Sequence, residues 1–353
     1  MALKNQIKKS NENSIGKGLA FIGIGAGVLY AAKKLIDRTK DINLKDKVVL
    51  ITGGGRGLGL VLARRFAEEG AKIAICSREK VELEDAKREL ETKGAEVFST
   101  VCDVTDEASA KLMVEEVRNY FGHIDVLVNN AGVIQVMPLE NAEKRDFEEA
   151  LNTHFWGVYY VTNAVLPEMK ERGEGRIVNI SSVGGKVAIP HLLPYSTSKF
   201  ALAGYSEGLR AELLKDGIYV TTVCPGLMRT GSPRQTTIKG KHELEYAWFK
   251  IGDSLPLISV SAEYAANEIV NATKRGDAEI IISLPARILA GFKGIFPDTT
   301  ADIMSLVNLI LPKANHQGGN KRLKGKDAES AFSNNFLTTL TDEAAVKNNE
   351  MLT

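Results

Sequence analysis

The sequence has few cysteines, few histidines and no excess of charge of either sign, and each shortage excludes a class of protein. Three cysteines among 353 residues, none of them in a CxxC pair, argue against a disulfide framework and indicate a reducing compartment. The five histidines show no HExxH or other ligand spacing, so we expect no metal site. Lys and Arg number 45 against 44 for Asp and Glu, which excludes the basic balance typical of nucleic-acid binding.

The remaining composition is that of a globular protein. Hydrophobic residues make up 44% of the chain and charged residues 25%, which excludes a wholly disordered or collagen-like chain. The length allows one large domain with extensions, or two domains. A chain of this length can bury a sizeable core without disulfides or metals.

One long uncharged run stands near the N-terminus. It extends from Gly18 to Ala32, with Lys17 before it and Lys33 after it. As a helix it would measure roughly 22 Å, and extension over 15–36 with snorkelling lysines would nearly span a bilayer. We therefore expect membrane contact through 15–36. A cleaved targeting segment, a helix packed on the protein's own core and a partner-binding helix remain as alternatives.

The chain from 45 to 284 alternates short β-rich runs with longer amphipathic runs. Nearly continuous apolar strands that alternate with helices indicate a parallel sheet covered on both faces. The sequence thus predicts a doubly wound, Rossmann-type α/β domain over 45–284, after an N-terminal segment at 1–44. The seven expected strands are 47–52, 71–76, 96–102, 124–129, 176–181, 218–224 and 279–283.

The C-terminal extension, 285–353, begins with two apolar runs, 286–296 and 299–311, split by Pro297. They predict two short helices, which would cap a pocket, touch a membrane or pack on the domain. Beyond Pro312 the chain is polar, and we expect a mobile end.

A glycine-rich turn joins the first expected strand to a helix. Glycines allow positive φ and close approach of a diphosphate, and the following helix N-terminus favours the anion. The spacing is TGxxxGxG, which resembles that of the short-chain dehydrogenase/reductase family. The resemblance implies cofactor contacts from Thr52, Gly53, Gly55, Arg56, Gly57, Leu58 and Gly59.

The residues after the second strand predict which dinucleotide binds. An acidic residue there would bind the ribose 2′-hydroxyl of NAD. Here Arg78 stands in that place, and Arg56 in the glycine turn could flank a 2′-phosphate. We therefore expect NADP in preference to NAD, although Glu79 leaves room for NAD.

Other family landmarks follow later strands. By resemblance, Asp103 and Val104 would contact adenine, and the NNAG motif would place Asn130 near the cofactor ribose. Residues after the sixth strand would contact the nicotinamide end. The further cofactor residues implied are Asp103, Val104, Asn130, Ala131, Gly132, Tyr195, Lys199, Pro225, Gly226, Met228 and Thr230.

The chemistry is expected at a YxxxK motif. Tyr195 and Lys199 share one face of a helix, so the phenol and the ammonium would enter one site. A nearby cation would lower the pKa of the phenol, which would then exchange a proton with a carbonyl or alcohol oxygen. Ser182, thirteen residues before the tyrosine, would orient the substrate oxygen.

One position departs from the family pattern. Relative to Phe-Trp-Gly, His154 stands where the family usually has an asparagine that holds a proton-relaying water. A neutral imidazole both donates and accepts, so His154 would preserve the relay. The alternative is a core histidine with satisfied hydrogen bonds.

These features predict an NADP-dependent oxidoreductase that transfers hydride between nicotinamide and a carbonyl or secondary alcohol. The aromatics of 231–260, a region expected to form a lid over the substrate, suggest a hydrophobic substrate. The apolar run at 15–36 suggests a membrane-associated protein on the cytoplasmic side. Family members often form homo-oligomers. A cofactor-binding scaffold or sensor without turnover, and an epimerase or dehydratase on the same fold, are the alternatives.

Overall fold

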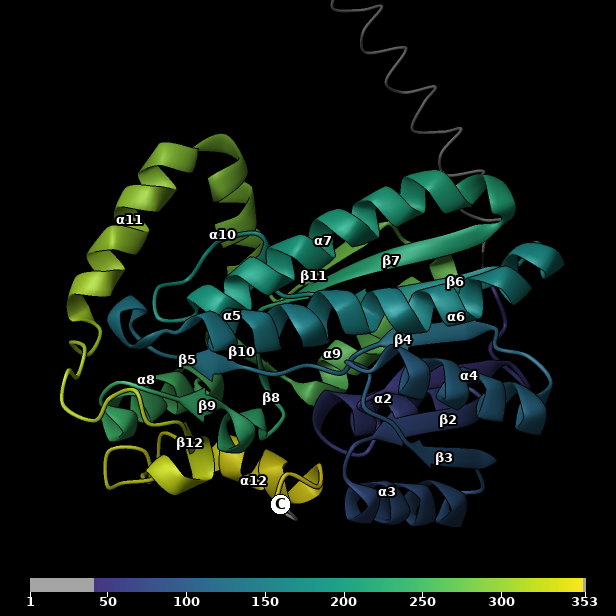
Figure 1. Ribbon diagram of the computed structural model, residues 1–353, viewed down its shortest axis with the longest axis horizontal. Helices are drawn as coiled ribbons and strands as arrows, with labels where there is room; N and C mark the ends of the chain where they lie inside the picture. Colours follow the sequence, from purple (N-terminus) through teal and green to yellow (C-terminus); the bar gives the residue numbers. More distant parts are fainter. Residues whose placement is uncertain (1–40, 352–353) are drawn as a thin grey trace, which may run out of the picture.

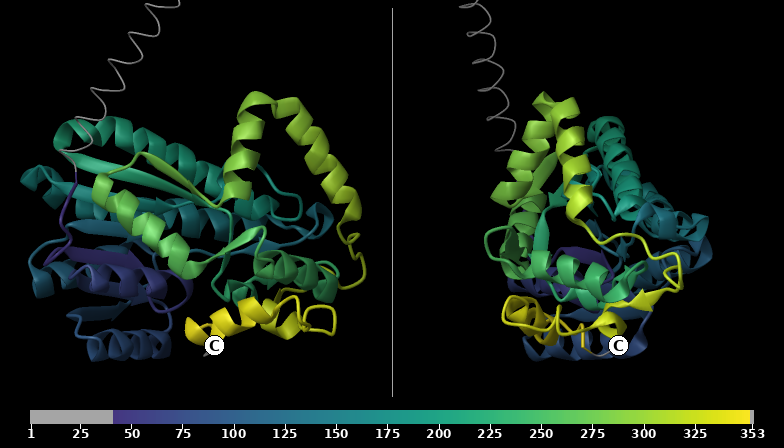
Figure 2. Two further views of the ribbon diagram at one scale, coloured as in Figure 1. Left: turned by 180° about the vertical axis from the view of Figure 1, so that it is seen from behind. Right: turned by 90° about the vertical axis from the view of Figure 1, so that its left-hand side faces the viewer.

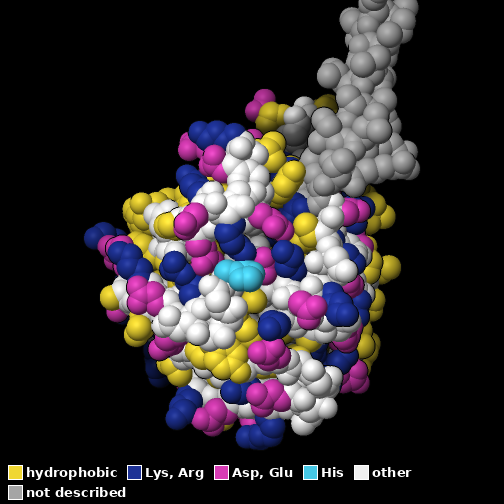
Figure 3. All heavy atoms as spheres, turned by 90° about the vertical axis from the view of Figure 1, so that its right-hand side faces the viewer, with side chains coloured by type: hydrophobic (Ala, Val, Ile, Leu, Met, Phe, Trp, Pro, Cys, Tyr) yellow, Lys and Arg dark blue, Asp and Glu magenta, His cyan; other side chains and the backbone are white. Residues whose placement is uncertain are grey.

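The computed structural model describes residues 41–351. The apolar run at 15–36, and the membrane contact predicted for it, lie outside the described residues. Within 41–351, none of the helices has both the length and the apolar character needed to span a bilayer. Acidic and basic side chains alternate over the face seen in Figure 3, as the balanced composition predicts.

The centre of the fold is a seven-stranded sheet in which every neighbouring pair is parallel. The strand order is β11-β7-β6-β4-β1-β2-β3, so the chain reverses its winding direction between β1 and β4 (Figure 1). Ligands of such sheets bind outside the carboxyl ends of the strands at this reversal. The strands are β1 (Val48–Thr52), β2 (Lys72–Ser77), β3 (Val97–Val101), β4 (Val126–Asn129), β6 (Gly175–Ile180), β7 (Ile218–Pro225) and β11 (Glu279–Ile282).

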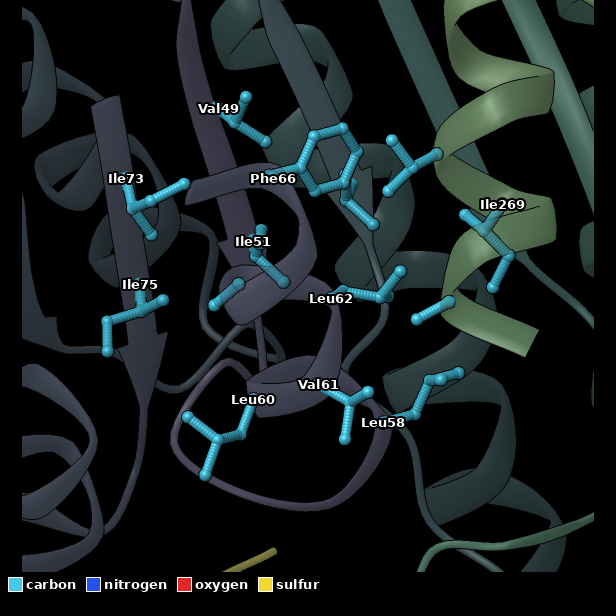
Figure 4. Close-up of a cluster of buried hydrophobic side chains, with 14 of the residues drawn as sticks. Val49, Ile51, Leu58, Leu60, Val61, Leu62, Phe66, Ile73, Ile75 and Ile269 are labelled. Atoms are coloured by element: carbon cyan, nitrogen blue, oxygen red, sulfur yellow. The ribbon is translucent and has the colours of Figure 1, made fainter. Parts of the chain in front are cut away.

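Two helical layers cover the sheet, and the predicted Rossmann-type fold is confirmed. Because side chains alternate along a strand, β1 sends Val49 and Ile51 to one layer and Val48 and Leu50 to the other. Figure 4 shows Val49 and Ile51 beside Phe66 and Leu62 of the first layer. That layer consists of α2 (Gly57–Glu68), α3 (Lys80–Thr92) and α9 (Ala262–Arg275); the second consists of α4 (Glu107–Phe121), α6 (Gly157–Arg172) and α7 (Leu193–Leu213).

Smaller elements extend the carboxyl edge of the sheet. A third apolar cluster joins Tyr246 and Phe249 of α8 to short strands, and Tyr195 packs against it. Tyr246 and Phe249 therefore belong to a small core of their own. The elements here are β5 (Gln135–Val136), α5 (Lys144–Leu151), β8 (Leu227–Arg229), β9 (Thr237–Ile238), α8 (His242–Ser254) and β10 (Ser259–Ser261).

The C-terminal extension contains the two predicted apolar helices, α10 (Leu284–Ile295) and α11 (Pro297–Ile310). They project from the body of the domain as an antiparallel pair (Figure 2). Pro297 at the start of α11 separates them, as expected, because proline fits the first turn of a helix.

The expectation of a mobile end beyond Pro312 was wrong for the residues described. The chain returns through β12 (Leu323–Lys324) and α12 (Thr339–Lys347), and runs beneath α8 in Figure 1. Several of its polar side chains are buried and hydrogen-bonded: Thr341, for example, is fully buried and donates to Asp253 at 3.3 Å. Polar composition predicted mobility because it does not reveal such partners.

Candidate active site

The glycine turn between β1 and α2 is held in a shape that only glycine allows. Gly53 and Gly57 have φ of 66° and 54°. A Cβ on Gly59 would lie 2.0 Å from the carbonyl oxygen of Gly53, so the helix and the turn touch backbone to backbone. No side chain caps α2, and its first turn has no acidic residue. The Asn348 carbonyl accepts the Gly57 N–H at 2.8 Å, and the Glu350 carboxylate lies beside Gly57. The remaining N–H groups of the first turn suit an anion.

The NNAG motif braces that turn. The Thr52 hydroxyl accepts the backbone N–H groups of Asn130 and Ala131, both at 3.0 Å. In return, the Asn130 amide donates to the carbonyl oxygens of Thr52 and Gly53, at 3.0 and 3.2 Å. The ends of β1 and β4 are thus tied together at the reversal of the sheet.

A cavity of about 430 Å³ opens from this point, within the size range of small-molecule sites. Most residues predicted for cofactor and chemistry line it together. They are Gly53, Arg56, Gly57, Leu58, Gly59, Arg78, Asp103, Val104, Asn130, Ala131, Gly132, His154, Tyr195, Lys199, Met228 and Thr230. Thr52, Gly55, Ser182, Pro225 and Gly226 are not among the lining residues.

The contacts of these five residues tie them to neighbouring segments of the fold. The Gly55 carbonyl accepts from the Asn349 amide at 3.3 Å, and the Gly226 N–H donates to Ile282 at 3.0 Å. Pro225 ends β7. The Ser182 hydroxyl accepts from the Gly184 N–H at 3.0 Å, and its proximity to Tyr195 lowers the pKa of the phenol.

Tyr195 and Lys199 lie on successive turns of α7, as the spacing predicted. The Lys199 Nζ lies 5.6 Å from the centre of the Tyr195 ring and donates to the Ile180 carbonyl at 2.8 Å. Lys199 is buried. The lysine therefore points along the floor of the cavity, beside the phenol.

Burial dominates the electrostatics of this pair. It raises the pKa of Tyr195 to about 12, partly opposed by the nearby Ser182 hydroxyl. Burial also lowers the pKa of Lys199 to about 7. The sequence predicted that Lys199 lowers the pKa of the phenol. In the folded chain the pKa of Tyr195 is raised instead, because desolvation of the phenolate outweighs the effect of Ser182.

His154 lies in a π-helical turn, Asn152–Trp156, between α5 and α6. Its Nε2 accepts the Val133 N–H at 3.1 Å, which assigns the imidazole proton to Nδ1. Nδ1 lies 2.7 Å from the Ser198 hydroxyl, which donates to the Tyr195 carbonyl at 2.7 Å. Burial, and then the charge of Lys199, hold the pKa of His154 well below 6.5.

Two cations stand where a 2′-phosphate was expected. Arg56 pairs with Glu82 of α3 at 2.7 Å and with Glu350 of the C-terminal segment at 3.5 Å. Arg78 is exposed at the cavity rim and has no ion-pair partner within 41–351. The same part of the chain holds no cluster of three metal-ligating side chains.

Sequence reasoning missed several lining residues. Three of them, Val133, Ile134 and Thr153, lie next to predicted motifs in the sequence, so their position could have identified them. Lys324 and Glu350 come from the C-terminal segment, and nothing local in the sequence marks them.

The cavity suits a dinucleotide. The glycine backbone leaves no room for a Cβ at Gly59, the α2 N-terminus faces an anion position, and cations stand at the far rim. These are the features required for a diphosphate and a 2′-phosphate.

The sequence of this chain is also similar to those of known proteins. The short chain dehydrogenase family model matches residues 47–239. Dehydrogenase/reductase SDR family member 7B of Danio rerio is 37% identical over 62% of this chain and 73% of its own length. Ketoacyl reductase HetN of Nostoc sp. is 32% identical over 68% of this chain and 79% of its own length.

Solved structures agree. An actinorhodin polyketide ketoreductase solved with NADPH has a TM-score of 0.60 and 32% identity, over 67% of this chain and 95% of its own. L-Sorbose reductase from Gluconobacter frateurii, complexed with NADPH and L-sorbose, has a TM-score of 0.61 and 26% identity, over 69% of this chain and 97% of its own. The chain belongs to the short-chain dehydrogenase/reductase family.

Proposed function

We propose that this protein is an NADP-dependent reductase or dehydrogenase that interconverts a carbonyl and a secondary alcohol. One observation carries the proposal: the Tyr195 phenol and the Lys199 amine line the same cavity as the glycine turn and Arg78. A proton donor, a basic group and a dinucleotide cradle in one cavity are what carbonyl reduction needs.

The roles of the side chains follow from their positions. In reduction, a hydride from a bound nicotinamide would reach the carbonyl carbon. Tyr195 gives its phenolic proton to the carbonyl oxygen, and the pKa of about 12 keeps that proton available at neutral pH. Ser182, close to the phenol, orients the oxygen. Lys199, with a pKa near 7, returns a proton to the phenolate.

The cofactor would extend along the cavity from Arg78 to Lys199. The glycine turn and the α2 N-terminus would hold the diphosphate, Asn130 the neighbouring ribose, and Met228 and Thr230 the nicotinamide end. Asp103 and Val104 would lie at adenine, and Arg78 with Arg56 at the 2′-phosphate, which favours NADP over NAD.

The substrate we propose is a hydrophobic ketone or aldehyde. Ile134 and Met228 line the cavity near Tyr195, and an apolar cluster lies behind the phenol. Two of the similar proteins are named ketoreductases, so a keto group is the first substrate function to test. Membrane contact through 15–36 and self-association remain predictions.

The test measures reduced-cofactor oxidation by the full-length protein with a panel of aliphatic ketones, aromatic aldehydes and a β-ketoacyl thioester. We expect oxidation of NADPH with an equal amount of alcohol formed, and at least about tenfold preference over NADH in kcat/KM. NADPH binding without turnover on the whole panel would indicate the scaffold alternative. Product formation without net oxidation would indicate an epimerase.

The geometry also assigns a role to His154. Both ring nitrogens are already hydrogen-bonded: Nε2 accepts from the Val133 N–H, and Nδ1 bonds the Ser198 hydroxyl. Because Ser198 in turn binds the Tyr195 carbonyl, we propose that His154 positions the turn that carries the phenol.

Replacement of His154 separates positioning from proton relay. We expect His154→Leu to lower the free energy of unfolding by about 1–3 kcal/mol, since the Val133 N–H loses its acceptor and the Ser198 hydroxyl loses its donor. Asparagine, which donates and accepts, should keep most of the turnover. Since the pKa of His154 lies well below 6.5, the pH profile of kcat should have the same inflections in wild type and His154→Asn. An inflection that disappears in the variant would show that His154 itself passes protons.

A further inference from the structure

The C-terminal segment beyond α11 places a lysine at the rim of the cofactor cavity. β12 pairs antiparallel with β9, with Lys324 opposite Thr237. The next residue, Gly325, donates its N–H to Thr236 at 2.9 Å, and a Cβ there would lie 2.0 Å from the Pro233 carbonyl. This close backbone contact fixes the register, so Lys324 is held at one position on the rim.

The C-terminal segment brings Lys324 and Lys326 to the cavity, and two arginines act on Lys324 there. Lys324 lines the cavity together with Arg56 and Arg78. Desolvation lowers the pKa of Lys324, the charges of Arg56 and Arg78 lower it further, and the charge of Glu149 opposes them. Lys324 donates to the Gln235 carbonyl at 3.2 Å, which aims its amine along the wall.

The nearby carboxylates, Glu79 and Glu149 among them, neutralise this cluster only in part. Glu82 and Glu350 pair with Arg56. Neither Arg78 nor Lys324 has a carboxylate within salt-bridge distance in the described part of the chain. Unpaired like charges that face one cavity repel each other, and a bound anion would remove that cost.

The position of the cluster identifies the anion. The diphosphate belongs at the glycine turn, whereas Arg78 follows β2, where the ribose of adenosine is held in such folds. We propose that Lys324 binds the 2′-phosphate of NADP(H) together with Arg78, so that the C-terminal segment is part of the cofactor site. This inference rests on the proposed NADP dependence.

The experiment is titration of the full-length protein with NADPH and with NADH, at two salt concentrations. Lys324→Ala should weaken NADPH binding about tenfold and leave NADH binding unchanged. Arg78→Ala should act in the same direction. The matched control is Lys321→Ala, an exposed lysine of the same segment that does not line the cavity. The loss of NADPH affinity should be larger at low salt, because high salt screens the attraction between an exposed lysine and a phosphate.

The outcomes separate this inference from the proposed function. If Lys324→Ala binds NADPH as Lys321→Ala does, Lys324 has no role. If it weakens NADPH and NADH equally, Lys324 acts on the diphosphate or on the fold, and the inference is overturned. NADPH binding that depends on Lys324 without turnover on any carbonyl would sustain the inference and overturn the reductase. Thermal unfolding of each variant checks that the segment stays docked.

Discussion

Tyr195→Phe should lower kcat by about 10³-fold while NADPH binding stays unchanged. The substitution removes only the phenolic hydroxyl. In our proposal this hydroxyl is the one group on α7 that donates a proton to the substrate oxygen. The aromatic ring keeps its edge-to-face contact with His154, at 5.6 Å between ring centres, so the helix should not move. Single-turnover oxidation of bound NADPH measures the effect directly.

The matched control for this variant is Tyr205→Phe. Tyr205 lies on the same helix, and burial likewise raises its pKa to about 12. Its ring packs against Phe155 and Tyr159, away from the cavity. We expect full activity from this control. Equal losses in both variants, or substantial turnover in Tyr195→Phe, would contradict the assignment of the proton donor.

Gly59→Ala should abolish most of the cofactor binding. The new Cβ would lie 2.0 Å from the Gly53 carbonyl oxygen and 2.6 Å from the Asn130 amide. Since the first of these is backbone, α2 must move away from the turn. We expect the free energy of unfolding to fall by about 1–3 kcal/mol. NADPH affinity should fall by about 100-fold, because a small displacement of the cradle misplaces every phosphate contact.

The control is Gly204→Ala, in α7, where an added Cβ would have no neighbour within 4 Å. Alanine there should stabilise the helix by about 0.5–1 kcal/mol, because glycine loses more backbone entropy in a helix. Urea denaturation and NADPH titration of both variants measure the two effects. A Gly59→Ala protein with wild-type NADPH affinity would show that the turn does not hold the diphosphate.

The electrostatics of the site could be predicted from the sequence only in part. The spacing of Tyr195 and Lys199 correctly placed them on one helical face. The sequence predicted that the pKa of the Tyr195 phenol is lowered, whereas in the folded chain it is raised. A motif shows which charges lie nearby, but it does not show how deeply the phenol is buried away from water. For His154, the sequence placed the residue but not its bonds to Val133 and Ser198, which come from two other segments.

The sequence by itself determined the seven strands, their parallel sheet and the glycine turn. Buried parallel strands are continuous apolar runs, and a turn against a helix N-terminus requires glycine at fixed spacing, so both leave local signals. Only the tertiary structure decided where the C-terminal segment goes. Lys324 and Glu350 reach the cavity through β12 pairing and backbone contacts with residues far away in the chain, and polar segments carry no local pattern that reveals such contacts.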